Sequence, residues 1–159
     1  MNWVDIIVII LLILGLLGGL KEGAVKAFSS LMAMYIAVFI SGLSYGLLAS
    51  LLAFLPYNWS NFLGFFITAG IISVILHFVF LIPRKVFGAM WKKGVVYRVL
   101  GGIFSLAGSI ISAAVFALVV RAYPVFDWLA RWVSDSGILN ILMDIFKFIL
   151  PAVSGTANL

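Results

Sequence analysis

The chain has 159 residues, of which 65% are hydrophobic and only 9% are charged, and its mean hydropathy is +1.30. This composition excludes an ordinary soluble domain, because a chain of this length has too much surface to hide so many apolar side chains in one core. The formal net charge of +5 favours contact with anionic lipid over nucleic-acid binding, because the basic residues gather in loops between apolar blocks.

Four long apolar blocks predict four membrane-spanning helices. Each block approaches or exceeds the roughly 20 residues that a helix needs to cross ~30 Å of hydrocarbon. The blocks cover residues 4–20, 27–55, 62–82 and 99–120. We therefore predict an all-α integral membrane protein with a four-helix transmembrane domain over residues 1–123.

Small residues recur at four-residue spacing in the first, second and fourth blocks and predict close helix packing. Backbones approach closely along such ridges, because lipid supplies no hydrophobic force for helix association. The first ridge is Gly15, Gly19 and Gly23, the second is Gly42, Gly46 and Ser50, and the third is Gly101, Ser105, Ser109, Ala113 and Ala117. These ridges predict a compact bundle or an oligomer.

The second block is longer than one span requires. A helix over residues 27–55 would exceed the ~30 Å core by about a third, at 1.5 Å per residue. It therefore tilts, extends into an interface or breaks. A break would cost least at residues 41–46, which combine two glycines with hydroxyl groups, and it would be typical of a transporter. Plain tilt is the simpler alternative.

The loops between the spans differ in charge, and this difference predicts the orientation of the chain. The loop around residues 56–61 has no charged residue. The first and third loops hold Lys21, Lys26, Arg84, Lys85, Lys92, Lys93 and Arg98. By the positive-inside rule, these basic loops face the cytoplasm, so that both termini lie outside.

Residues 124–153 follow a proline and are predicted to form two short amphipathic helices. Their apolar faces hold Val125, Trp128, Leu129, Trp132 and Val133 in the first helix, and Ile138, Leu142, Ile145, Phe146 and Ile149 in the second. Both patterns are typical of helices that lie in the outer membrane interface. A fifth span over residues 138–153 is the alternative, but it would place two charged side chains at bilayer depth. Residues 154–159 are expected to form a flexible tail.

Few ionisable side chains lie at or within the predicted spans. Asp5 opens the first span, where the helix N-terminus stabilises a carboxylate, and a proton-binding role is the alternative. His77 is either a neutral side chain hydrogen-bonded to a neighbouring helix or a proton-sensitive group. Glu22 is expected to pair with Lys26, which follows it by one helical turn.

The sequence has no motif of a known catalytic site. It lacks a glycine-rich phosphate loop with its lysine, a nucleophile elbow and paired carboxylates within one span. The absence of cysteine excludes disulfides and thiol chemistry, and the remaining side chains offer no metal ligands at suitable spacing. We therefore expect no enzyme, no cofactor and no bound metal.

Three short segments resemble the colicin V production protein family of bacterial inner-membrane proteins. They are Asn2-Trp3-Val4-Asp5-Ile6-Ile7, Leu20-Lys21-Glu22-Gly23-Ala24-Val25-Lys26 leading to Ser30-Leu31, and Arg98-Val99-Leu100-Gly101-Gly102-Ile103-Phe104. The residues that match the family are Asp5, Gly23, Lys26, Arg98, Gly101 and Gly102. The chain departs from the family's charge pattern at Glu22, Ala27, Tyr97 and Ala107.

The resemblance implies a non-enzymatic protein of the bacterial inner membrane, linked with production or export of a peptide toxin and with envelope homeostasis. From the ridges we infer a membrane subunit that assembles with copies of itself or with other envelope proteins. The alternative is a small transporter or channel near the second ridge, with Asp5 or His77 as its proton-sensitive group. A third hypothesis is a scaffold that binds lipid through Lys92, Lys93 and the amphipathic helices.

Overall fold

The computed structural model describes residues 2–90 and 94–145, and these residues form helices joined by short turns, without β-strands. Four long helices are apolar enough to cross a membrane, namely α1 (Trp3–Glu22), α2 (Ala24–Leu51), α3 (Tyr57–Val79) and α5 (Val95–Ala122). Three shorter helices are α4 (Leu81–Met90), α6 (Asp127–Ser134) and α7 (Gly137–Ile145). The prediction of an all-α protein with four candidate spans is confirmed.

The second span is one uninterrupted helix, so the alternative of a break at residues 41–46 is wrong. The hydroxyl of Ser41 donates to the carbonyl oxygen of Ala37 at 2.5 Å, one turn back, and thus bonds within an intact helix. The predicted span also ends early, because residues 52–55 form a turn before α3. At 1.5 Å per residue, α2 is about 42 Å long, which leaves tilt or extension beyond the ~30 Å core.

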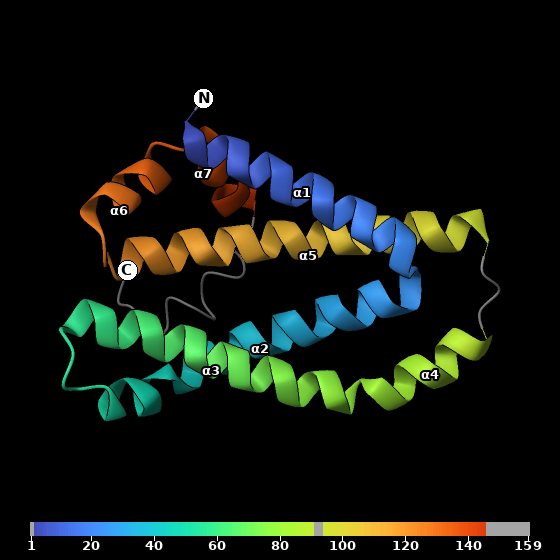
Figure 1. Ribbon diagram of the computed structural model, residues 1–159, viewed down its shortest axis with the longest axis horizontal. Helices are drawn as coiled ribbons and strands as arrows, with labels where there is room; N and C mark the ends of the chain where they lie inside the picture. Colours follow the sequence, from blue (N-terminus) through green and yellow to red (C-terminus); the bar gives the residue numbers. More distant parts are fainter. Residues whose placement is uncertain (1, 91–93, 146–159) are drawn as a thin grey trace.

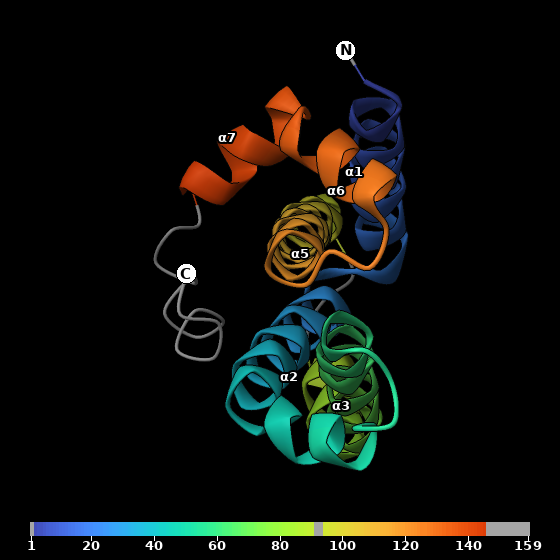
Figure 2. The ribbon, with the colours of Figure 1, turned by 90° about the vertical axis from the view of Figure 1, so that its left-hand side faces the viewer.

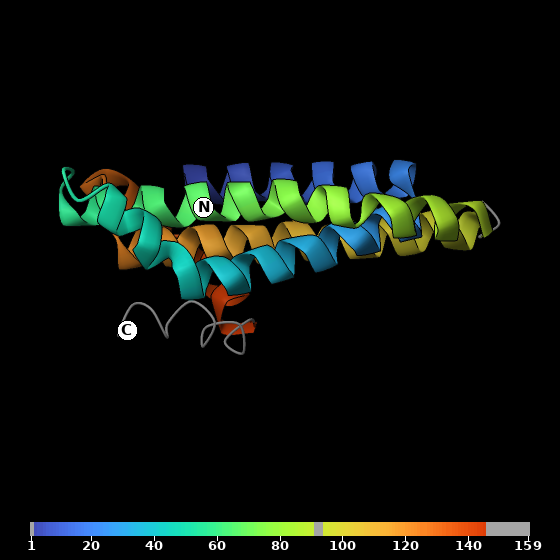
Figure 3. The same ribbon diagram turned by 90° about the horizontal axis from the view of Figure 1, so that it is seen from below.

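The four spans are arranged as a curved row and not as a closed square. Helix α5 packs between α1 and α2, and α2 packs in turn against α3 (Figure 2). Seen from below, α1 and α3 lie on the same side of the layer formed by α5 and α2 (Figure 3). The row therefore has a concave face, flanked by α1 and α3.

The closest approach in the row joins α1 and α5. A Cβ atom added at Gly19 would lie 2.2 Å from the carbonyl oxygen of Gly101, and one at Gly101 would lie 2.4 Å from the carbonyl oxygen of Gly19. A Cβ atom at Gly15 would lie 1.9 Å from the hydroxyl oxygen of Ser109. The first and third ridges thus pack against each other within one chain, and at these residues they are not available to another molecule.

The turn between α1 and α2 requires glycine for two reasons. Gly23 has a φ of 87°, a backbone conformation that residues other than glycine rarely adopt. In addition, a Cβ atom there would lie 1.9 Å from the ring of Tyr97. Beside this turn, Glu22 and Lys26 form the expected ion pair, with 2.8 Å between Oε1 and Nζ. The contact between Gly23 and Tyr97 places the turn against the first part of α5.

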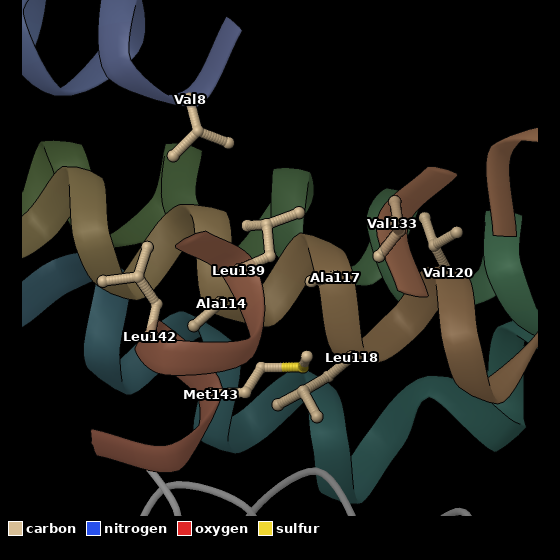
Figure 4. Packing of buried hydrophobic residues seen from close by; sticks show 9 residues of the cluster. All are labelled: Val8, Ala114, Ala117, Leu118, Val120, Val133, Leu139, Leu142 and Met143. Carbon is tan, nitrogen blue, oxygen red and sulfur yellow. The ribbon is translucent and has the colours of Figure 1, made fainter. Parts of the chain in front are cut away.

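From this contact α1 and α5 diverge, and the C-terminal helices fill the space between them at the other end (Figure 1). Val133 of α6 and Leu139 of α7 are 0% and 1% exposed. They pack with Val8 of α1 and Ala117 of α5 in one apolar cluster (Figure 4). The helices α6 and α7 are therefore part of the core.

The apolar faces predicted for these two helices are divided between the core and the surface of the chain. Val133 is buried, whereas Trp128 and Trp132, which are predicted to lie on the same face, are 53% and 42% exposed. Leu139 and Met143, which the pattern did not select, are buried against α1 and α5. Phe146 and Ile149, the tail, and much of the alternative fifth span lie outside the described residues.

Two neighbouring glycines of α1 test the backbone contact. Gly19→Ala places a methyl group against the backbone of α5 and should lower the free energy of unfolding by about 1–3 kcal/mol. In Gly18→Ala the added Cβ meets no atom within 4 Å, so stability should stay unchanged or rise by up to ~1 kcal/mol. Thermal unfolding in micelles, followed by circular dichroism, measures both. Equal stability of the two variants would contradict the proposed contact.

Candidate functional site

A lateral groove of about 800 Å³ runs along the concave face of the row. The four spans line it, and α6 and α7 contribute at one end. Its walls are mainly apolar and include Leu11 of α1, Met34 of α2, Phe66 of α3 and Phe116 of α5. A cavity of this size lies within the range of small-molecule sites, which is about 300–1,000 Å³.

The polar groups within the groove are mostly serine hydroxyls. Ser105, Ser109 and Ser112 follow one another along α5, and Ser73 lies on α3. The hydroxyl of Ser109 donates to the carbonyl oxygen of Ser105 at 3.0 Å, so this group is satisfied within its own helix. The middle of the groove thus offers weak polarity without a charge.

Cationic side chains collect at one end of the molecule. The turn between α1 and α2, the helix α4 and the first residues of α5 lie together there (Figure 1). The described basic residues of this end are Lys21, Lys26, Arg84, Lys85 and Arg98. Lys92 and Lys93 lie outside the described residues.

Two basic residues reach side chains of the groove, namely Lys26, which pairs with Glu22, and Arg84. The Nη2 of Arg84 donates to the hydroxyl of Ser30 at 3.2 Å, and its Nη1 lies 3.4 Å from Nδ1 of His77. Ser30 lines the groove together with Glu22. The Nε of Arg84 is buried and has no hydrogen-bond partner among the described residues.

The opposite end is held by a buried carboxylate. Asp5 is 4% exposed, and its Oδ2 accepts a hydrogen bond from the backbone N–H of Asn2 at 2.8 Å. Its Oδ1 accepts from the hydroxyl of Ser136 at 2.5 Å and from the N–H of Ile138 at 3.3 Å. The hydroxyl of Ser136 in turn accepts from the N–H of Leu139 at 3.2 Å and caps α7. One carboxylate therefore serves the N-termini of α1 and α7, where the helix dipoles stabilise it.

Further hydrogen bonds extend this arrangement, which we call the Asp5 clasp, to α5 and α6. The side-chain amide of Asn2 donates to the carbonyl oxygen of Trp132 at 3.1 Å. Arg121, in the last turn of α5, donates to Oδ1 of Asn140 at 2.5 Å and to the carbonyl oxygen of Ser134 at 3.3 Å. The clasp consists of Asn2, Asp5, Arg121, Trp132, Ser134, Ser136, Ile138 and Asn140. It joins the start of α1 and the end of α5 to the connection between α6 and α7.

The two predicted proton-sensitive groups do not share a site. Asp5 lies in the first turn of α1, whereas His77 lies in the last turn of α3, just before α4. His77 is exposed and stands beside Arg84. Within residues 2–90 and 94–145, His, Asp and Glu form no group of three or more that could hold a metal ion.

Sequence reasoning missed Ser136 as the partner of Asp5. A local signal exists, because a serine followed by glycine and an apolar run is typical of a helix N-cap. Nothing in the sequence indicates that the hydroxyl of this cap also donates to a carboxylate far away in the chain. That pairing depends on the tertiary fold.

The remaining candidate residues fall into two groups. Gly102 lies at the contact of α1 with α5, where an added Cβ would be 2.8 Å from Cδ2 of Leu20, whereas Arg98 is exposed in the first turn of α5. In the second ridge, Gly42 is buried, but Gly46 is exposed and an added Cβ there would meet no atom within 4 Å. The second ridge is therefore partly open.

Comparison with known proteins gives one match. A sequence model of the family described as Colicin V production protein matches residues 4–147. Neither a curated protein nor a solved structure matches the chain.

The Asp5 clasp is tested by removing its charge without changing its shape. Asp5→Asn should weaken the hold on the N-terminus of α7, because the amide lacks the charge that strengthens both hydrogen bonds to Oδ1 and puts a donor in place of the other carboxylate oxygen. We expect the backbone amides of α7 to exchange hydrogen about tenfold faster, measured by mass spectrometry on the protein in micelles. The matched control is Asp135→Asn, an exposed carboxylate one residue before Ser136, which should leave this exchange unchanged. Equal exchange in Asp5→Asn and the unsubstituted protein would contradict the clasp.

Proposed function

Because the chain belongs to the colicin V production protein family, we propose that it is a non-catalytic subunit of a protein assembly in a bacterial inner membrane. In this proposal it takes part in toxin production or export, or in envelope homeostasis. The observation that best supports a subunit role is the contrast between acidic groups that bond within the chain and an outer surface that is apolar. Asp5 and Glu22 bond within the chain, whereas the long helices present apolar side chains outward.

The second half of α2 is the surface that we assign to assembly. The first and third ridges pack against each other within the chain, but Gly46 and Ser50 of the second ridge are exposed. Beside them, Leu43 and Leu47 are 67% and 75% exposed. Small residues between large apolar ones allow a second membrane helix to approach closely. The partner is a second copy of the chain or another envelope membrane protein.

A small transporter or channel is the second candidate, and the lateral groove with its serine hydroxyls is the observation that favours it. Two features of the structure favour the subunit instead. The carboxylate of Asp5 accepts three hydrogen bonds from the starts of α1 and α7, whereas His77 lies at the end of α3 beside Arg84 of α4. A proton path that uses both residues would therefore need a large rearrangement.

The orientation follows from the charges and has a direct test. We propose that the basic end faces the cytoplasm, which puts the start of α1 and the connection between α6 and α7 outside. The chain has no cysteine, so single cysteines can be introduced and labelled without background. An impermeant maleimide should label Asp135→Cys in intact spheroplasts and Lys85→Cys only after the membrane is opened. The reverse pattern would contradict this orientation.

In-membrane crosslinking at native expression level, followed by mass spectrometry, tests the subunit role. We expect crosslinks to an envelope complex or to a second copy, and Gly46→Leu should reduce them severalfold because leucine blocks the close approach. Gly70→Leu adds the same side chain at an open glycine of α3 and is the matched control. Crosslinks that survive Gly46→Leu would contradict this surface, and a protein without any crosslinked partner would contradict the subunit role.

A further inference from the structure

We propose that the lateral groove binds an acyl chain of an anionic phospholipid, whose phosphate group is held by Arg84. This binding site goes beyond the proposed assembly function, and it uses a different face of the molecule.

The groove has the dimensions of a lipid chain. Helix α5 lines it from Phe104 to Phe116, which is about 18 Å at 1.5 Å per residue. One leaflet of a bilayer contributes half of the ~30 Å hydrocarbon core, or about 15 Å. The groove lies between spans, so in a membrane the neighbours of its open side are lipid chains and not water. Its apolar walls, such as Met34 and Phe66, suit this occupant.

The two ends of the groove differ in polarity, and this difference gives the occupant a direction. At the basic end, Glu22 is the acidic side chain that lines the groove, and Lys26 pairs with it at 2.8 Å. The charge of Arg84 is thus left without a counter-ion among the described ion pairs. At the other end the lining residues are apolar, namely Leu129, Val133 and Leu139. An amphiphile with an anionic head and an apolar tail therefore fits in one orientation, with its head beside Arg84.

Arg84 has unused hydrogen-bonding capacity for a phosphate. A guanidinium carries five N–H donors. In the described structure Arg84 makes two long contacts, to Ser30 at 3.2 Å and to His77 at 3.4 Å, and its Nε is buried without a partner. Phosphate oxygens match the fork of an arginine and accept from two of its donors at once. A headgroup at this position would supply the partners that the protein does not.

A lipid matches the groove better than a protein helix does. A partner helix could also place its C-terminus or an acidic side chain beside Arg84, but the unused donors of the guanidinium match the several oxygens of a phosphate. An acyl chain fills only the apolar part, and the headgroup remains at the membrane interface, where α4 and the first turn of α5 bring the basic residues together (Figure 1).

Native mass spectrometry on the purified full-length chain tests the proposal. Phosphatidylglycerol and phosphatidylcholine are added in equal amounts, and the ratio of the two bound lipids is measured. We expect phosphatidylglycerol to be retained about tenfold more, as one charge-assisted pair predicts. Arg84→Gln should remove this preference, whereas Lys85→Gln, an exposed lysine next in sequence, should keep it.

A second pair of variants tests the groove itself. Ser112→Phe places a ring on its floor and should abolish retention of phosphatidylglycerol, whereas Ser50→Phe, on the exposed part of α2, should not. Circular dichroism confirms that each variant is folded. Equal retention of both lipids by the unsubstituted chain would overturn the proposal, as would unchanged preference in Arg84→Gln. A Ser112→Phe variant that keeps its lipid but loses a crosslinked partner would assign the groove to a protein. These lipid ratios do not depend on assembly, so their failure leaves the proposed subunit role to the crosslinking experiment.

Discussion

The close approach of α1 and α5 at their shared basic end is the constraint on which the rest of the structure depends. Gly19 and Gly101 bring two backbones to a distance at which neither residue could carry a Cβ atom. Gly23 continues this contact into the turn that leads to α2. From this contact the two helices diverge toward the start of α1, and a wedge-shaped space lies between them (Figure 1). Side chains of α6 and α7 fill that space.

The filled wedge needs a polar connection at its open end, and Asp5 supplies it. A carboxylate that is nearly inaccessible to solvent is costly unless it is hydrogen-bonded, and here three donors meet its two oxygens. Two of these donors belong to the start of α7 and one to the start of α1. The same carboxylate therefore caps the N-terminus of α1 and positions the N-terminus of α7. This explains why an acidic side chain is compatible with the first residues of a membrane-spanning helix.

The sequence predicts some features of this arrangement better than others, and the difference has a physical origin. The four spans follow from the length of apolar blocks, which a bilayer imposes on every helix that crosses it. The ridges at Gly19 and Gly101 mark surfaces of close packing, but a ridge does not specify its partner. The sequence alone therefore cannot distinguish packing of two helices within one chain from packing between two chains. The amphipathic pattern of α7 indicates an apolar face without indicating what covers it, and burial of Leu139 depends on the divergence of α1 from α5. The pairing of Asp5 with Ser136 is likewise a product of the tertiary fold.

The curved row also determines what the molecule can offer to the membrane. A closed bundle of four helices would direct its polar side chains inward and leave a uniform apolar surface, which gives lipids and proteins little to recognise. In the row, α1 and α3 stand apart on the concave side, so one face keeps a groove, and Arg84 contacts Ser30 of its lining. The exposed glycine of the second ridge lies on a different part of α2 from the residues that line this groove. The proposed lipid binding and the proposed assembly therefore use two distinct surfaces of one molecule and need not compete.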